Sequence, residues 1–106
     1  MNIKKLILVI IVIIALAIVG VVIWYNSSLS EVDKKDTSKI QVEIPIGSSA
    51  ENIATILKNN DLIKNKLAFK LYVKLNKVSN FQAGKYELYK TMNVEEITKT
   101  LQTGKL

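Results

Sequence analysis

Apolar and polar residues are distributed unevenly along this chain, and the longest apolar stretch comes first. Residues 6–25 contain no charged side chain, no amide and no hydroxyl before the closing tyrosine, in the order LILVIIVIIALAIVGVVIWY. A helix of this length rises about 30 Å, which matches the hydrocarbon core of a bilayer. A helix also pairs its backbone polar groups internally, as lipid requires. The stretch therefore predicts a transmembrane helix over 6–25.

The flanks of this helix predict its orientation. Lys4 and Lys5 precede it, whereas Trp24 and Tyr25 close it as interfacial aromatic anchors. Positive charge favours the cytoplasmic side. We therefore expect a single-pass protein of the cytoplasmic membrane, with residues 1–5 as a cytoplasmic tip and the remainder outside.

Two alternatives to a retained anchor exist. A buried core helix requires a larger protein around it than this chain provides. A cleaved signal peptide is the stronger alternative, but its apolar region usually spans only about 7–15 residues. Residues 28–30 (Ser-Leu-Ser) match a small-x-small cleavage site weakly. The retained anchor is favoured.

A polar segment with mixed charge, residues 26–39, predicts a flexible linker. Residues 40–44 then alternate between apolar and polar side chains, which predicts a half-buried strand that Pro45 ends. Ser48 stands three residues before Glu51, the spacing of a capping box at the start of a helix. Asn59 or Asn60 is expected to end that helix in the left-handed conformation.

A second helix is expected from the cap residue Asn65 to about Asn76. At about 100° per residue its lysines share an arc about 80° wide, and apolar side chains cover nearly all the rest. These lysines are Lys66, Lys70, Lys74 and Lys77. The helix is therefore expected mainly in the core, with some apolar area left for a neighbouring domain or the membrane.

The last two elements repeat the first pair. A strand is expected over 85–89, and Asn93 with Glu96 opens a helix that Gly104 ends. A shift of 44 positions places Ile53 on Ile97. The predicted fold class is α+β, in which one transmembrane helix precedes a small domain over 40–106, with β-α-α-β order and a further C-terminal helix.

Composition removes several classes of function. The 106 residues include no Cys, no His and no Arg, and lysine alone gives the net charge of +6. Disulfides, thiolate metal sites and bidentate Arg contacts with phosphate are therefore absent. Outside the cytoplasm, a lysine excess beside a bilayer fits anionic lipid or wall polymers better than nucleic acid. A solvated surface is the alternative.

The acidic residues suggest no catalytic site. Those of the folded part are assigned to helix starts, a connector or outward strand faces: Glu43, Glu51, Asp61, Glu87, Glu95 and Glu96. No phosphate loop, nucleophile elbow or metal-ligand cluster is present in the sequence. We therefore expect no catalytic residue, metal or cofactor among these residues, and binding is the favoured class.

Two loops, residues 46–49 and 79–84, would lie side by side if the two strands pair. Their hydroxyls and amides, with one aromatic ring, suit the hydroxyl groups of sugars. The candidate glycan-binding residues are Gly47, Ser48, Ser49, Asn80, Phe81 and Gln82. The alternative, that these are ordinary turn and cap residues with Phe81 in the core, stays open.

An ordered set of motifs carries a family resemblance. Val42-x-Ile44-Pro45-x-Gly47-Ser48-Ser49 is followed by Gln82-Ala83-Gly84-x-Tyr86-x-Leu88, and then by Met92-x-x-Glu95-x-Ile97-x-x-Leu101-x-x-Gly104. The set resembles the N-terminal part of the membrane-anchored endolytic murein transglycosylases, the YceG-like family. The resemblance implies a LysM-like subdomain just outside the membrane, with peptidoglycan glycan strands as its partner.

In that family a larger domain cleaves nascent glycan strands with a glutamate as general acid/base. No residue here matches that glutamate, and the sequence stops where the catalytic domain would begin. We therefore expect the anchor and LysM-like part of such a transglycosylase, a lyase of cell-wall biogenesis. The alternative is a stand-alone, membrane-tethered interaction module that binds glycan or a cell-wall synthesis protein without catalysis.

Overall fold

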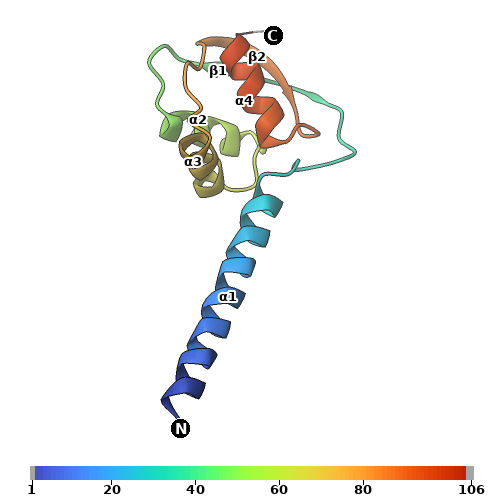
Figure 1. The fold of residues 1–106 in the computed structure, drawn as a ribbon. Coiled ribbons are helices and arrows are strands. Elements are labelled where there is room, and N and C mark those ends of the chain that lie inside the picture. Colours follow the sequence, from blue (N-terminus) through green and yellow to red (C-terminus); the bar gives the residue numbers. More distant parts are fainter. Residues whose placement is uncertain (1, 105–106) are drawn as a thin grey trace.

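The computed structural model describes residues 2–104, which form one long helix and a small α+β domain on its C-terminal end (Figure 1). The elements are α1 (Ile3–Ser28), β1 (Lys39–Ile44), α2 (Ala50–Asn59), α3 (Lys66–Leu75), β2 (Gly84–Tyr89) and α4 (Val94–Thr103). The predicted α+β class and β-α-α-β-α order are confirmed. Met1 of the predicted tip and residues 105–106 of the predicted domain lie outside the described residues.

Helix α1 stands apart from the domain along most of its length (Figure 1). It is long and apolar enough to cross a membrane, and its apolar side chains are exposed all round. It contains the predicted span 6–25 and continues for three residues at each end. The extension arises because backbone hydrogen bonding, rather than apolar composition, determines where a helix ends. The Asn2 side chain accepts a hydrogen bond from the Lys4 N–H at the N-terminus.

The two strands form an antiparallel pair in which Ile40 lies opposite Leu88 and Val42 opposite Tyr86. Alternate residues face the helices, so Val42, Tyr86 and Leu88 are buried as predicted. A two-stranded sheet has little stability alone. The helices that cover this sheet therefore stabilise it.

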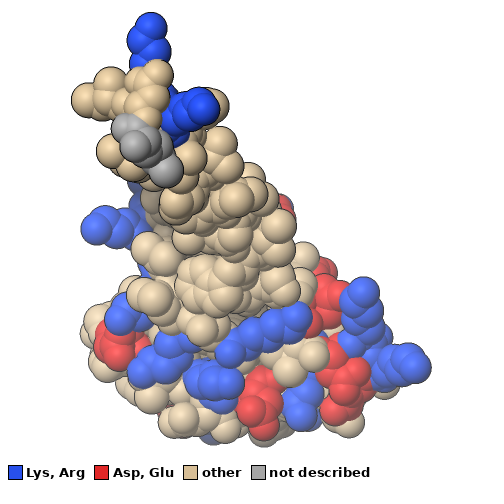
Figure 2. Space-filling view, turned by 90° about the horizontal axis from the view of Figure 1, so that it is seen from below, with Lys and Arg blue, Asp and Glu red and all other residues tan. Residues whose placement is uncertain are grey.

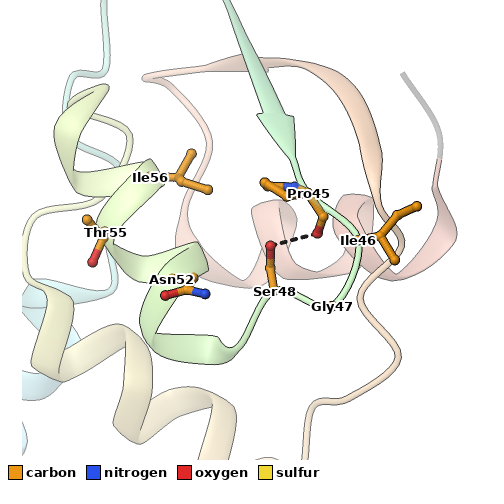
Figure 3. A pocket seen from close by; sticks show the side chains of 7 residues that line it. All are labelled: Pro45, Ile46, Gly47, Ser48, Asn52, Thr55 and Ile56. Atoms are coloured by element: carbon orange, nitrogen blue, oxygen red, sulfur yellow. Dashed lines mark hydrogen bonds between the residues drawn. The ribbon is translucent and has the colours of Figure 1, made fainter.

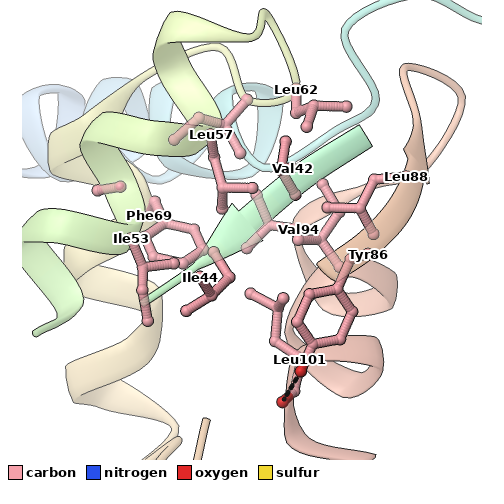
Figure 4. Close-up of a cluster of buried hydrophobic side chains, with 13 residues drawn as sticks. Val42, Ile44, Ile53, Leu57, Leu62, Phe69, Tyr86, Leu88, Val94 and Leu101 are labelled. Atoms are coloured by element: carbon pink, nitrogen blue, oxygen red, sulfur yellow. Dashed lines mark hydrogen bonds between the residues drawn. The ribbon is translucent and has the colours of Figure 1, made fainter. Parts of the chain in front are cut away.

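The core is formed where the three helices meet that sheet (Figure 4). Each of the three helices contributes side chains with no exposed surface, including Ile53 of α2, Phe69 of α3 and Leu101 of α4. Burial of one such side chain contributes about 1.5–3 kcal/mol. The connector before α3 adds Leu62 and Ile63 to the core, as its apolar content suggested.

The start of α2 differs from the prediction. Ser49, and not Ser48, is the N-cap, and its hydroxyl accepts a hydrogen bond from the Asn52 N–H at 3.2 Å. The Ser48 hydroxyl instead donates to the Pro45 carbonyl at 2.7 Å, because a turn through Gly47 precedes the helix. The predicted capping box between Ser48 and Glu51 is therefore wrong.

The end of α2 also differs from the prediction. Asp61, and not Asn59 or Asn60, takes the left-handed conformation, with φ of 56°. The Asn60 side-chain amide is engaged with the helix, since it donates to the Ile56 carbonyl at 2.8 Å. Asn60 itself has φ of −99°, and the left-handed residue follows it at Asp61.

The remaining helix ends agree with the sequence. Asn65 caps α3, and its side chain accepts from the Ala68 N–H at 3.0 Å. Asn93 and Glu96 form the reciprocal bonds of a capping box at the start of α4. Gly104 ends α4 with φ of 69°, where a Cβ would lie 3.2 Å from the Gln82 side chain.

The segment that follows α1 contacts the domain directly. The Leu29 carbonyl accepts from the Val94 N–H at 3.0 Å, and the Lys90 carbonyl accepts from the Asp33 N–H at 3.1 Å. Lys64 donates to the Ser30 hydroxyl at 2.8 Å. The first residues of the predicted linker, 26–28, belong to α1. The end of α1 is therefore attached to the domain by hydrogen bonds, and Leu29 packs against the core.

Candidate functional site

The two loops singled out in the sequence lie side by side. Ile44 pairs with Gly84, so the loop after β1 and the loop before β2 meet at one edge of the sheet. They enclose a pocket of about 190 Å³, to which Gly47, Ser48 and Phe81 contribute. The structure thus brings together these three of the predicted residues.

A neighbouring groove of about 330 Å³ runs from the same loop to the first turns of α2 (Figure 3). Its walls combine the apolar Ile46 and Ile56 with the polar Asn52 and Thr55. Ile46 is 93% exposed at the tip of the loop. The groove and the pocket share residues 45–48, so this loop is the wall between them.

Local backbone chemistry fixes the shape of that loop. The Ser48 N–H and hydroxyl both donate to the Pro45 carbonyl, at 3.2 and 2.7 Å. Gly47 has φ of 78°, a conformation that costs a side-chain-bearing residue about 1 kcal/mol or more. The turn is therefore closed on itself and holds Ile46 outward.

The other predicted residues are occupied in local structure. Ser49 caps α2, and Asn80 has φ of 62° while its carbonyl accepts from the Gln82 side-chain amide. The Gln82 N–H donates to the Leu101 carbonyl at 2.7 Å, and its carbonyl accepts from the Tyr86 hydroxyl at 2.5 Å. Ser49, Asn80 and Gln82 thus shape the two loops, whereas Gly47, Ser48 and Phe81 line the pocket.

The Tyr86 hydroxyl ties the second loop to α4, because it also donates to the Leu101 carbonyl at 3.3 Å (Figure 4). Burial raises the pKa of Tyr86 above its ordinary value of 10.0. The hydroxyl therefore remains a donor at neutral pH, and it fixes the position of Gln82 beside Phe81.

Sequence reasoning missed Ile46, Asn52 and Thr55 as parts of the site. The sequence does contain a pattern that could have indicated them. Asn52 and Thr55 lie three positions apart, so they share one face of α2, away from the buried Ile53. Ile46 is an apolar residue in a turn that is otherwise expected to be polar. An isoleucine at such a position is a candidate for an exposed apolar contact, because it is not part of the core.

Glu51 directly precedes the groove residue Asn52, and its surroundings stabilise its charged form. Hydrogen bonds from Lys70 at 2.5 Å and Lys66 at 3.2 Å hold the pKa of the Glu51 carboxyl below its ordinary value of 4.5. A general acid needs the opposite shift. Within residues 2–104, no three His, Cys, Asp or Glu side chains gather as metal ligands do. The arrangement suits binding through hydroxyl, amide and aliphatic groups.

Residues 42–106 match the sequence model of the YceG-like family, which covers more than half of the chain. The chain belongs to the YceG-like family. The resemblance that the sequence motifs carried is therefore confirmed.

Individual YceG-like proteins show the same relationship. The chain is 44% identical over 88 residues to the endolytic murein transglycosylase of Bacillus subtilis, which covers 82% of this chain. It is 36% identical over 77 residues, 73% of its length, to the protein of the same name from Streptococcus pneumoniae. The crystal structure of a yceG-like protein from Listeria monocytogenes matches 64% of this chain at 47% identity, with a TM-score of 0.62.

These YceG-like relatives are much longer than the region they share with this chain. The chain spans 24% of the Bacillus subtilis protein and 14% of the Streptococcus pneumoniae protein. It covers 22% of the Listeria monocytogenes chain. The family match over residues 42–106 includes most of the small domain, in which the two pockets lie.

Proposed function

We propose that this chain is the membrane-anchoring and glycan-docking part of a peptidoglycan endolytic transglycosylase. Glycan cleavage itself is assigned to residues outside it, in the catalytic domain of such an enzyme. The observation that carries the proposal is the arrangement of the domain. The loop after β1, whose residues 45–48 line both pockets, lies at the end away from an apolar helix long enough to span a membrane (Figure 1). The names of the relatives support the choice of substrate.

In this proposal α1 crosses the cytoplasmic membrane with its N-terminus inside. Lys4 and Lys5 support that orientation, and the aromatic pair at 24–25 suits the outer interface. The attachment of Leu29 and Ser30 to the domain then holds the domain close to the outer surface of the bilayer. The anchor restricts the enzyme to glycan strands near the membrane.

The loop at residues 45–48 is the proposed glycan contact, used in the manner of a LysM module. Ser48, Asn52 and Thr55 offer donors and acceptors for sugar hydroxyls, and Ile46 offers an apolar surface to the face of a sugar ring. In other binding pockets, a few polar groups in a mainly apolar lining orient small ligands in the same way.

The orientation is tested by cysteine labelling, for which the absence of native Cys is an advantage. Single variants Asn2→Cys and Asn59→Cys of the full chain are treated in intact bacterial cells with a membrane-impermeant maleimide. We expect only Asn59→Cys to react, because both side chains are exposed but lie on opposite sides of the membrane. Reaction of Asn2→Cys in intact cells would contradict the orientation.

Glycan docking is tested by co-sedimentation of the full chain, in lipid nanodiscs, with purified insoluble peptidoglycan. We expect Ile46→Ser to weaken binding about tenfold, because it removes the apolar contact at the tip of the loop. Asn59→Ser is the control, since Asn59 is exposed on α2 but lines neither pocket. Equal weakening by both variants, or binding that neither changes, would contradict the assigned site.

A further inference from the structure

The outward side of α3 carries leucines that the core does not use. Leu67 is 55% exposed and Leu75 is 67% exposed, and Leu71 lies half-buried between them. These three residues are spaced by four, so they form one stripe along the helix. We call Leu67, Leu71 and Leu75 the leucine stripe. Surface leucines are common singly, but three in line beside a membrane-spanning helix form a continuous apolar surface.

Helix α3, which carries the leucine stripe, lies close to the point where α1 enters the domain. Lys64, one turn before Leu67, donates to the Ser27 carbonyl at 3.3 Å and to the Ser30 hydroxyl at 2.8 Å. Tyr72, adjacent to Leu71, shares a pocket with Asn26 and Leu29. Figure 1 shows α3 at the end of the domain from which α1 descends. Helix α3, which carries the stripe, is therefore adjacent to the C-terminal end of α1.

Positive charge surrounds this end of the domain. Lysines gather on the face from which α1 emerges, with fewer acidic residues between them (Figure 2). On α3 the lysines run alongside the leucine stripe, and Lys66 and Lys70 pair with Glu51. Within residues 2–104, Lys64 and Lys74 have no acidic partner within salt-bridge distance. Leucines bordered by unpaired lysines are typical of helices that lie in the headgroup layer of an anionic membrane.

We propose that the leucine stripe of α3 rests in the headgroup layer of an anionic lipid bilayer, as a second membrane contact beside α1. The inference rests on the proposed function in one respect, that α1 is inserted in a bilayer. The lysines that border the stripe complement anionic headgroups, and the contact of α3 with the end of α1 brings the stripe near the bilayer, so lipid is the occupant. Two contacts fix the tilt of the domain, so residues 45–48 point away from the membrane instead of rotating about α1.

The depth of spin labels in reconstituted bilayers tests this contact. Single variants Leu75→Cys, Ile46→Cys and Val12→Cys of the full chain receive a nitroxide label in vesicles of phosphatidylglycerol and phosphatidylcholine. Ile46→Cys is the matched control, because Ile46 is also an exposed aliphatic residue but lies at the other end of the domain. Relaxation by oxygen reports lipid, and relaxation by a water-soluble nickel chelate reports solvent.

We expect the label at position 75 to respond to oxygen more than to the nickel chelate, and the label at 46 to do the reverse. In pure phosphatidylcholine vesicles we expect the ratio of oxygen relaxation to nickel relaxation at position 75 to fall several-fold, because the lysines then have no anionic lipid partner. A label at 75 that responds mainly to the nickel chelate would overturn the contact. A label shielded from both reagents would also overturn it, because a protein surface then covers the stripe.

The label at position 12 separates the two proposals. If position 12 responds to oxygen while position 75 does not, α1 is inserted and only the second contact fails. If position 12 responds to the nickel chelate, α1 is not inserted, and both the anchor and the contact that depends on it are contradicted. Equal oxygen preference at position 75 in both kinds of vesicle would overturn the role given to Lys64 and Lys74.

Discussion

The domain contains two junctions in which a strand is followed by a helix. They differ in how completely their loop residues are hydrogen-bonded to the rest of the chain; we call the first junction open and the second closed. At the second junction, β2 leads to α4 through a complete capping box, and the Val94 N–H is bonded to the Leu29 carbonyl at the end of α1. At the first junction, β1 leads to α2 through a turn, and Ile46 projects into solvent. The second junction is attached to the end of α1, whereas the first is open and its loop lines two pockets.

The difference shows how one pattern can serve two roles. Both units have an acid in the first turn of the helix and an isoleucine in the core, 44 positions apart. Glu96 closes its own cap, but the equivalent position of the first unit is Asn52, which has no carboxylate. Glu51, the counterpart of Glu95, pairs instead with Lys66 and Lys70 of α3. At the first junction a single serine, Ser49, therefore caps the helix, and the loop before it is left exposed.

The largest contrast is expected from the same substitution in each unit. Ile97→Ala should destabilise the domain by about 2–5 kcal/mol, because Ile97 has no exposed surface and its truncation leaves a cavity. Ile46→Ala should change the free energy of unfolding by less than about 0.5 kcal/mol. Guanidinium unfolding of the full chain in detergent micelles, followed by tyrosine circular dichroism, measures both. Similar losses would contradict the division between closed and open junctions.

The bond between the second loop and α4 comes next. Tyr86→Phe should cost about 1–2 kcal/mol, because the Gln82 carbonyl loses its hydroxyl donor while the ring remains packed. The same unfolding experiment measures this loss. Tyr89→Phe is the control, since Tyr89 is also a β2 tyrosine but alternates to the other face. A larger loss for Tyr89→Phe would show that the hydroxyl of Tyr86 does not hold the loop.

The helix caps give smaller effects that sharpen the contrast. Asn93→Ala should cost about 1 kcal/mol, and Ser49→Ala a similar amount, because each removes an N-cap. Ser48→Ala should cost less than about 0.5 kcal/mol, since its hydroxyl bonds an exposed turn. Unfolding of the three variants compares these costs. If Ser48→Ala proved more destabilising than Ser49→Ala, Ser48 would be the N-cap, as the sequence predicted.

The smallest expected effect concerns the pH dependence of stability. The pKa of Glu51 is lower in the folded chain than its ordinary value of 4.5, so its charged form stabilises the fold above that pH. This contribution is lost as the pH falls through the lowered value. Glu51→Gln should therefore lose less stability than the unsubstituted chain between about pH 6 and about pH 3.

Thermal unfolding at several pH values measures that slope. Glu43→Gln is the control for loss of a charge, because Glu43 lies on the outer face of β1 and has no ion pair among the described residues. A Glu51→Gln slope equal to that of the unsubstituted chain would contradict the ionic bridge between α2 and α3.

Periodicity and caps predicted most of this fold. Alternation placed Val42, Tyr86 and Leu88 in the core, and Asn65, Asn93 and Gly104 marked helix ends, since each of these signals is local. The cap of α2 could not be predicted, because Ser48 and Ser49 both suit an N-cap and a turn through Gly47 decides between them. The ion pairs of Glu51 depend on lysines at least fifteen positions away.

The candidate site was predicted only in part. The pairing of two strands brought residues 46–49 and 79–84 together, which the sequence indicated. Which side chains line the pockets depends on tertiary contacts, such as the bond from Tyr86 to the Gln82 carbonyl, that no local spacing reveals. The resemblance indicated peptidoglycan as the partner, but it did not distinguish Gly47, Ser48 and Phe81 from residues that only shape the loops.

The most direct test of the open junction is an NMR titration of the full chain, in nanodiscs, with soluble peptidoglycan glycan oligomers. The backbone amides of Gly47, Ser48 and Phe81 should shift as oligomer is added, while those of Asn93 and Glu96 at the closed junction should not. Shifts confined to the closed junction, or no shifts at either, would contradict the account that the open junction binds glycan.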